Sequence, residues 1–132
     1  MPHLVSPFTV VARPPADDPD AGESPVLGLT VFDKVFAGGG LLGTSVVRMV
    51  STGTEAGPLA YVALERVEGE LDGRSGAFVL RHVGAVTATG LSLELAVIEG
   101  SPTGALVGLS ATGTIEHTAD GARLELDYSL PD

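Results

Sequence analysis

The most constraining feature of this chain is an alternation of apolar and polar side chains with a period of two. Near the C-terminus, Leu124, Leu126, Tyr128 and Leu130 alternate with charged or small polar residues. Such alternation is typical of a β-strand with one buried face. No window of the sequence combines helical spacing over three turns with capping residues at its ends. The chain is therefore expected to be all-β.

The alternation, together with the Gly- and Pro-rich interruptions, predicts about eight strands. The expected strands are Leu4–Arg13, Val26–Ala37, Thr44–Ser51, Leu59–Gly69, Ser75–Gly84, Leu91–Glu99, Leu109–Thr118 and Ala122–Leu130. The 132 residues are expected to form a single domain, 1–132, which is long enough to bury a core. The segment 14–25 is rich in Pro and Asp, which predicts a surface loop.

A recurring turn sequence organises the strands. The pattern G-x-L-x-G-x-S occurs three times, at Gly39–Ser45, Gly69–Ser75 and Gly104–Ser110. In the first two copies glycine supplies the positive φ that tight hairpins need, Ser45 and Ser75 are expected to be turn residues, and the central Leu can plug one end of a barrel. The third copy either forms a turn or extends a strand through its second half.

Hairpins that alternate between two ends predict an up-and-down antiparallel meander. Eight such strands leave exposed edges unless the sheet closes. Closure gives an interior just wide enough for packed side chains or one small ligand. We therefore predict a single closed antiparallel up-and-down β-barrel of about eight strands, lipocalin-like in size. A two-sheet sandwich is the alternative, but it would normally need more long crossovers than this chain has room for.

Composition excludes several classes of function. The chain has no Cys, which excludes disulfides, thiolate zinc sites and a cysteine nucleophile. Its net charge of −10 argues against nucleic acid and anionic membranes as partners. Neither a long apolar segment nor a signal-peptide pattern is present, so a cytoplasmic location is expected. Standard catalytic, phosphate-binding and metal-binding signatures are missing, so no cofactor or metal is expected.

A long central stretch resembles a known family. The segment Tyr61–His82 is similar to the central motif of a bacterial family of unknown function whose members are allene-oxide-cyclase-like barrels. The resemblance continues in Lys34–Gly38, Gly43–Ser45, Gly100–Gly108 and Leu126–Tyr128. It implies a barrel fold and no established activity. The plant cyclase that names the fold acts by confining its substrate, and that analogy concerns the fold alone.

The chain departs from the pattern of this family in two places. The stretch Gly38–Gly43 is one residue longer and lacks the acidic residue usually found near Gly39. Ala12 and Arg13 stand where a tryptophan is frequent at the end of the first strand. Both departures bear on any ligand that the family would share.

Glu65 is the most interesting acidic residue. The alternation puts it on one strand face with Tyr61 and Ala63. If this face points inward, Glu65 is a carboxylate in an apolar cavity, where burial would raise its pKa and suit it to acid–base catalysis. The alternative is a purely structural carboxylate that pairs with Lys34 or Arg48.

His82 is a candidate proton shuttle because it shares a face with Phe78. A hydrogen-bonded structural role is the alternative. Pairing back from the Gly69–Ser75 hairpin places Glu65 near Val79. This register predicts that His82 lies beyond direct contact with Glu65, so that only a ligand could touch both.

Four further residues are candidate ligand contacts besides Tyr61. Lys34 lies between Phe32 and Phe36 on one face, as a partner for Glu65 or an anchor for an anionic ligand. Its alternative is an ammonium group that reaches solvent. Phe32, Phe78 and Tyr128 complete the predicted ligand-binding set, although a tyrosine in such a strand is usually a core residue.

Three functions remain open from the sequence. The first is a barrel that binds a small, mostly apolar metabolite. The second is a cofactor-independent isomerase, cyclase or lyase in which Glu65 and His82 act as acid and base. The third is a non-catalytic structural or assembly barrel filled by its own side chains. Outward aliphatic residues such as Val62 and Leu64 also predict a homo-dimer or trimer.

Overall fold

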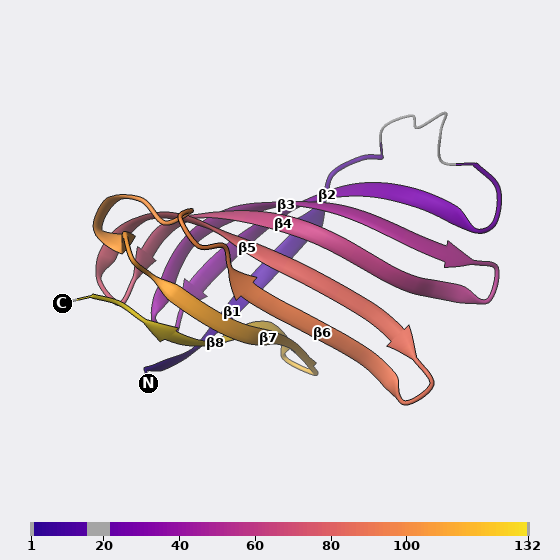
Figure 1. The fold of residues 1–132 in the computed structure, drawn as a ribbon. Coiled ribbons are helices and arrows are strands. Elements are labelled where there is room, and N and C mark those ends of the chain that lie inside the picture. The colour runs from indigo at the N-terminus through magenta and orange to yellow at the C-terminus, as the bar shows by residue number, and fades with distance from the viewer. Residues whose placement is uncertain (1, 16–21, 132) are drawn as a thin grey trace.

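The chain folds into a closed antiparallel β-barrel. The computed structural model describes residues 2–15 and 22–131. Its strands are β1 (His3–Ala12), β2 (Val26–Gly38), β3 (Leu41–Thr54), β4 (Gly57–Leu71), β5 (Arg74–Thr87), β6 (Gly90–Val97), β7 (Ser110–Thr118) and β8 (Gly121–Ser129), with a short 3₁₀ helix, η1 (Gly104–Leu106), before β7. Each strand pairs with the next, and β8 pairs with β1 to close the sheet (Figure 1). The predicted eight-stranded up-and-down barrel is confirmed.

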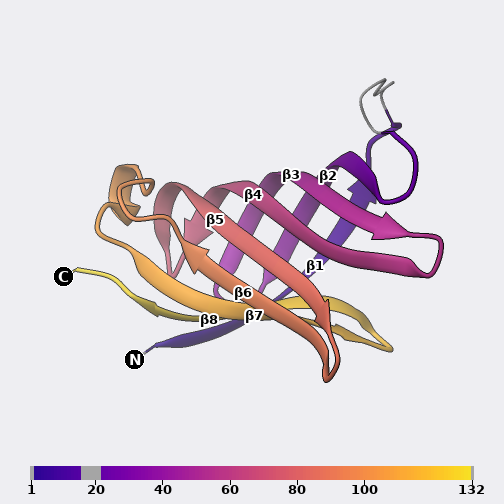
Figure 2. The ribbon, with the colours of Figure 1, turned by 45° about the vertical axis from the view of Figure 1, so that its right-hand side comes forward.

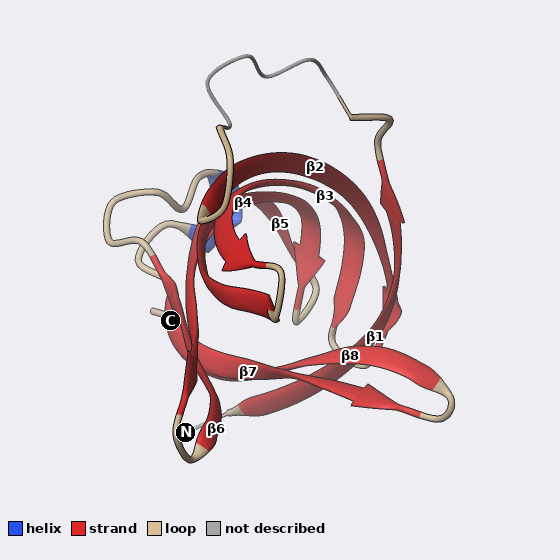
Figure 3. Ribbon diagram, turned by 90° about the vertical axis from the view of Figure 1, so that its right-hand side faces the viewer, coloured by secondary structure: helices blue, strands red, loops and turns tan. Residues whose placement is uncertain are grey.

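The strands differ in length, which makes the two ends of the barrel unlike. Strands β2 to β5 have 13 to 15 residues, whereas β1, β6, β7 and β8 have 8 to 10. Strands β2 to β5, together with β6, which pairs with β5 as far as Thr87–Gly90, project past β1, β7 and β8 at the end where the β3–β4 hairpin lies (Figure 1 and Figure 2). Strands β6 and β7 share only the pairs Leu95–Gly113 and Ala96–Thr112 among the described residues. Figure 3 looks into the barrel from this projecting end.

The expected surface loop connects β1 and β2. Of the expected surface loop, residues 14–15 and 22–25 are exposed, and residues 16–21 lie outside the described part of the chain. None of the helices in the described part has the length and apolar character needed to span a membrane.

The β4–β5 hairpin sets the register of the central strands. Leu71 pairs with Arg74 across a two-residue turn, Asp72–Gly73, in which both residues have positive φ (52° and 78°). This is the geometry of a type I′ turn, whose twist matches that of the flanking strands. The predicted register assumed a turn centred on Asp72 and is wrong by one residue. Glu65 lies opposite Leu80, not Val79.

The central leucine of each recurring turn sequence plugs the same end of the barrel. Leu41, Leu71 and Leu106 are all fully buried, and Leu41 lies directly opposite Leu71. The prediction that the leucines of the first two copies plug one end of the barrel is confirmed, and Leu106 of the third copy lies in the same buried cluster. The alternative that the third copy extends a strand is wrong, because Gly104 and Gly108 have positive φ and residues 104–106 form η1.

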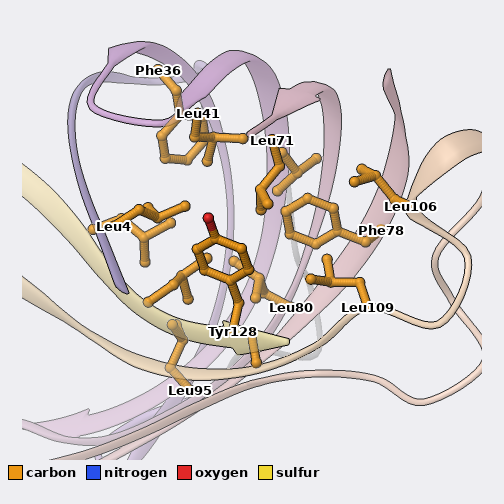
Figure 4. Close-up of a cluster of buried hydrophobic side chains, with 14 of the residues drawn as sticks. Leu4, Phe36, Leu41, Leu71, Phe78, Leu80, Leu95, Leu106, Leu109 and Tyr128 are labelled. Atoms are coloured by element: carbon orange, nitrogen blue, oxygen red, sulfur yellow. The ribbon is translucent and has the colours of Figure 1, made fainter. Parts of the chain in front are cut away.

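The connection between β6 and β7 closes this end. Beyond the part of β5 that pairs with β6, the backbone N–H of Thr103 donates to Ala77 O (2.8 Å), and Val79 N–H donates to Ser101 Oγ (3.0 Å). The connection thereby places Leu106 over the lumen. We call this region the packed end (Figure 4). Its larger buried side chains are those of Leu4, Phe36, Leu41, Leu71, Phe78, Leu80, Leu95, Leu106, Leu109, Leu124, Leu126 and Tyr128.

Candidate ligand-binding site

The lumen is hollow toward the projecting end. A cavity of about 210 Å³ lies there, lined by Phe8, Val10, Phe32, Lys34, Val47, Met49, Tyr61, Ala63, His82, Ile115 and His117. These residues come from β1, β2, β3, β4, β5 and β7, and alternate along each strand with outward-facing residues. An engineered cavity of roughly 150 Å³ suffices to hold benzene. The space therefore suits a molecule of about one ring with a few further atoms.

A buried carboxylate lies just below the cavity. Glu65, on β4, is 1% exposed. Its Oε1 accepts hydrogen bonds from His82 Nε2 (2.8 Å) and Lys34 Nζ (3.3 Å), and its Oε2 accepts one from Ser45 Oγ (2.6 Å). The inward orientation and the pairing with Lys34 that the sequence allowed are confirmed. The prediction that Glu65 and His82 do not touch is wrong, because the one-residue change of register makes them diagonal neighbours on one face.

The protonation state of Glu65 follows from these contacts. Burial alone would raise its pKa, but the hydrogen bond from His82, the positive charge of Lys34 and the hydrogen bond from Ser45 together outweigh burial and lower the pKa below its ordinary value. The expected rise in pKa is therefore wrong. An ionised Glu65 can only accept hydrogen bonds, so His82 donates through Nε2–H.

Lys34 is held inside the barrel by two different partners. Besides Glu65, its Nζ lies 4.4 Å from the centroid of the Phe8 ring, in cation–π geometry. Lys34 is 8% exposed, so the alternative in which it reaches solvent is wrong. Arg48 does not pair with Glu65, because it lies on the outer face of β3 opposite Leu64. Lys34 has three N–H donors and lines the cavity, so it retains donor capacity for a ligand.

The second ring nitrogen of His82 faces the cavity. Within residues 2–15 and 22–131, His82 Nδ1 makes no hydrogen bond, and no buried side-chain nitrogen or oxygen lacks a partner. Nδ1 is therefore in contact with open space, and His82 lines the cavity. With the ring proton on Nε2, the other ring nitrogen, Nδ1, can present a lone pair to that space.

Tyr61 forms one side wall of the cavity. A Cβ added to Gly84 would lie 2.3 Å from Tyr61 Cε1, so the tyrosine ring lies flat against the β5 backbone at this glycine. Burial and the negative charge of Glu65 raise the pKa of Tyr61. Its phenol therefore stays protonated at neutral pH.

The other predicted ligand contacts divide between the two ends. Phe32 lines the cavity with Lys34 and Tyr61. Phe78 and Tyr128 instead lie in the core of the packed end, 1% and 6% exposed. Burial and the neighbouring carboxylate of Asp72 raise the pKa of Tyr128. The structure therefore does not place these two aromatic residues at the cavity.

Sequence reasoning missed several residues of the site. Ser45 was expected in a turn, but β3 already begins at Leu41, and Ser45 lies within the strand opposite Lys34. Its place in the alternation with Val47 and Met49 was the signal that could have revealed it. His117 shares the inward face of β7 with Ile115 in the same way. Phe8 was not singled out either, because only the fold brings β1 beside Lys34.

The charged groups at the cavity are basic. The titratable side chains that line it are Lys34, Tyr61, His82 and His117, and none of its described lining residues is acidic. In the described part of the chain, no group of three or more His, Cys, Asp or Glu residues could hold a metal ion.

Comparisons with known proteins place the chain in a family. A family model described as a protein of unknown function, DUF3224, matches residues 4–129. A crystal structure of a DUF3224 protein of unknown function from Shewanella oneidensis is 32% identical and aligns with a TM-score of 0.88 over 100% of this chain and 98% of that one. No curated protein matches. The bacterial family of unknown function that the sequence resembles is thus found, while its allene-oxide-cyclase-like character stays a prediction. The chain belongs to the DUF3224 family.

Proposed function

We propose that this protein binds a small, mostly apolar molecule in the hollow half of its barrel. The observation that carries the proposal is the contrast between the two ends. The packed end is filled by leucine and phenylalanine, whereas the other half keeps an apolar cavity with Lys34 Nζ and His82 Nδ1 at its floor. Apolar walls with a few convergent polar groups are the usual form of a small-molecule site.

A second hollow extends the cavity toward the projecting end. It measures about 300 Å³ and shares Met49 and Tyr61 with the first. Leu59, Val86 and Leu91 also line it and are 43%, 50% and 72% exposed. Exposed apolar side chains gathered beside a cavity are typical of a binding surface. They support a ligand whose apolar body extends beyond one ring.

The first test is ligand retention. The purified protein is extracted and the extract is analysed by mass spectrometry, with thermal-shift measurements on a metabolite library. In the variant Met49→Trp an indole fills the cavity, while in the control Val50→Trp it lies on the outer face, where Val50 is 45% exposed. We expect retained ligand and thermal shifts in the native protein and the control, and neither in Met49→Trp. Equal results in both variants would contradict the proposal.

A second function is favoured by the hydrogen bond between Glu65 and His82. A carboxylate that fixes Nε2–H leaves Nδ1 free to take a proton from a bound molecule, and Lys34 lies ready to stabilise an oxygen that becomes negative. This arrangement supports a cofactor-independent isomerase, cyclase or lyase. In it His82 is the acid–base group and Glu65 is a positioning residue. The resemblance to allene-oxide-cyclase-like barrels supports this alternative by fold analogy alone.

Proton abstraction can be tested without knowing the substrate. Small ketones and enones are incubated with the protein in D₂O, and incorporation of deuterium beside the carbonyl is followed by mass spectrometry. Catalysis predicts incorporation that is lost in His82→Gln, whose amide can still donate to Glu65, and kept in His3→Gln, because His3 is exposed and does not line the cavity. Incorporation that is the same with and without His82 would exclude it as the base.

A further inference from the structure

The charge of the cavity lining is opposite to that of the whole chain. The protein has 17 acidic and 7 basic residues, yet the described titratable residues that line the cavity are one lysine, two histidines and a tyrosine. Glu65 lies behind this lining, and both of its oxygens already accept hydrogen bonds. A ligand in the cavity therefore meets positive and hydrogen-bonding groups but no free carboxylate.

The floor of the cavity offers one donor and one acceptor side by side. Lys34 Nζ and His82 Nε2 are both bound to the same atom, Glu65 Oε1, at 3.3 Å and 2.8 Å. Lys34 can donate to a ligand oxygen, while His82 Nδ1 can accept from an O–H group. A carboxylic acid carries both an acceptor oxygen and an O–H on one carbon atom.

Charge balance selects the form in which such an acid is held. The ammonium of Lys34 and the carboxylate of Glu65 already cancel, so a further isolated charge in this apolar space would be costly. A carboxylate that arrives with one proton keeps the site neutral. The proton is shared between the ligand oxygen and His82 Nδ1. The net charge of the site is the same whichever of the two atoms holds the proton.

We propose that the ligand is an apolar monocarboxylic acid, with a body of about one ring or a short aliphatic chain, bound at Lys34 and His82 together with one proton. This inference rests on the proposed small-molecule function and names its ligand class. An amine would oppose Lys34. An alcohol brings a single oxygen atom without negative charge, so it lacks the second oxygen of an acid and the charge that a carboxylate places against the ammonium of Lys34.

The pH dependence follows from the surroundings of His82. The titratable groups that face it are Glu65 and Tyr61 from β4, Lys34 from β2 and His117 across the cavity on β7. From β6 it is paired with the apolar Leu95. Where the free acid is ionised and His82 is neutral, binding takes up one proton. The affinity then falls about tenfold for each pH unit of increase.

The test uses three probes with one body: phenylacetate, 2-phenylethanol and 2-phenylethylamine, measured by titration calorimetry on the full chain at pH 7.5 and 8.5. We expect phenylacetate to bind at least tenfold more tightly than the alcohol, and the amine not to bind. The binding of phenylacetate should weaken about tenfold at the higher pH, whereas the binding of the alcohol should not change. Equal or tighter binding of the alcohol or the amine would overturn the acid inference and leave small-molecule binding in place.

Two variants locate the acid. His82→Gln keeps a donor for Glu65 but removes Nδ1, and should abolish both the preference for phenylacetate and its pH dependence. The control is His3→Gln, because His3 is exposed, pairs with Asp127 and does not line the cavity. It should change neither, and an effect of this control equal to that of His82→Gln would overturn the assigned position. If none of the probes binds, the acid inference fails for this ligand size. The proposed function is then judged separately by the retention experiment with Met49→Trp and Val50→Trp.

Discussion

Glu65 is kept ionised in an apolar barrel by three donors that are distant from it in sequence. His82, Lys34 and Ser45 come from β5, β2 and β3, and each is buried. Both carboxylate oxygens of Glu65 accept hydrogen bonds from these three donors, so a change at Glu65 affects all three contacts. Loss of the carboxylate charge leaves Lys34 as a buried cation without its counterion.

Replacing Glu65 by Gln should therefore be strongly destabilising. Removal of one partner from a buried ion pair typically costs about 3–5 kcal/mol. We expect the free energy of unfolding, measured with urea, to fall by at least about 3 kcal/mol. The control is Glu68→Gln, because Glu68 makes an exposed salt bridge with Arg66, and such pairs contribute about 0–1 kcal/mol. Similar losses in the two variants would contradict the described network.

The same carboxylate predicts a pH dependence of stability. The pKa of Glu65 is lowered on folding from an ordinary value of 4.5, so its contribution is present in full above that value. The contribution is lost as the pH falls below 4.5 toward the lowered pKa. The difference in unfolding free energy between the native protein and Glu65→Gln should therefore shrink between pH 6 and pH 3. A difference that stays constant over this range would show that Glu65 is not ionised in the fold.

At the scale of the strands, alternation and register carry different information. Alternation alone correctly grouped Glu65 with Tyr61, and His82 with Phe78, on shared faces. It could not show that Glu65 touches His82, because that depends on whether the β4–β5 turn has two residues or three. The sequence Asp72–Gly73 is the signal for a two-residue turn and would have given the correct register.

The turn sequences indicated the leucines that plug one end, but the sequence could not show which other inward residues lie in the packed end and which line the hollow half. Phe78, Tyr128 and Tyr61 are all inward aromatic residues, and their local patterns are alike. What separates them is the extension of β2 to β6 past β1, β7 and β8 and the crossing of residues 98–109 over one end. Both features belong to the tertiary structure, and the alternation of apolar and polar residues along the sequence does not indicate them.

Gly84 tests the fit between β4 and β5. An alanine here would place its Cβ 2.3 Å from Tyr61 Cε1 and force the ring into the cavity. We expect Gly84→Ala to lower the free energy of unfolding by about 1–3 kcal/mol, which is typical of overpacking. We also expect it to weaken the binding of any ligand in the cavity. The control is Ala96→Val, because Ala96 lies on the outer face of β6 opposite Arg81 and lines neither hollow. Gly84→Ala combined with Tyr61→Ala should recover much of the stability lost through the clash. Unchanged stability in Gly84→Ala would mean that the ring does not lie on this backbone.

At the scale of the whole molecule, the outer face of the long strands is unusually apolar. Leu29 pairs with Val50, Val50 with Val62, and Val62 with Val83, in one row across β2 to β5. Leu29, Val50 and Val62 are 55%, 45% and 54% exposed. The next row on this outer face carries Arg48 and Arg81, and the row after it carries Arg66 together with Asp33.

The expectation of a homo-dimer or trimer thus stays a prediction that concerns this face. Light scattering coupled to size-exclusion chromatography should give a mass of two or three chains for the native protein. Val62→Glu should reduce it to one chain, because the substitution puts a charge into the apolar row. A single-chain mass for the native protein at high micromolar concentration would contradict the prediction.

The separation of the two halves of the lumen has a consequence for how this scaffold can change. The side chains that close the barrel, such as Leu41, Leu71 and Leu106, are different from those that face its hollow half. Substitutions at Val10, Phe32 or Met49 can therefore reshape the hollow half while the leucine plug keeps the strands together. The shape of the cavity can in this way change without loss of the barrel, so the design of new ligand-binding barrels on this backbone can begin from these wall positions.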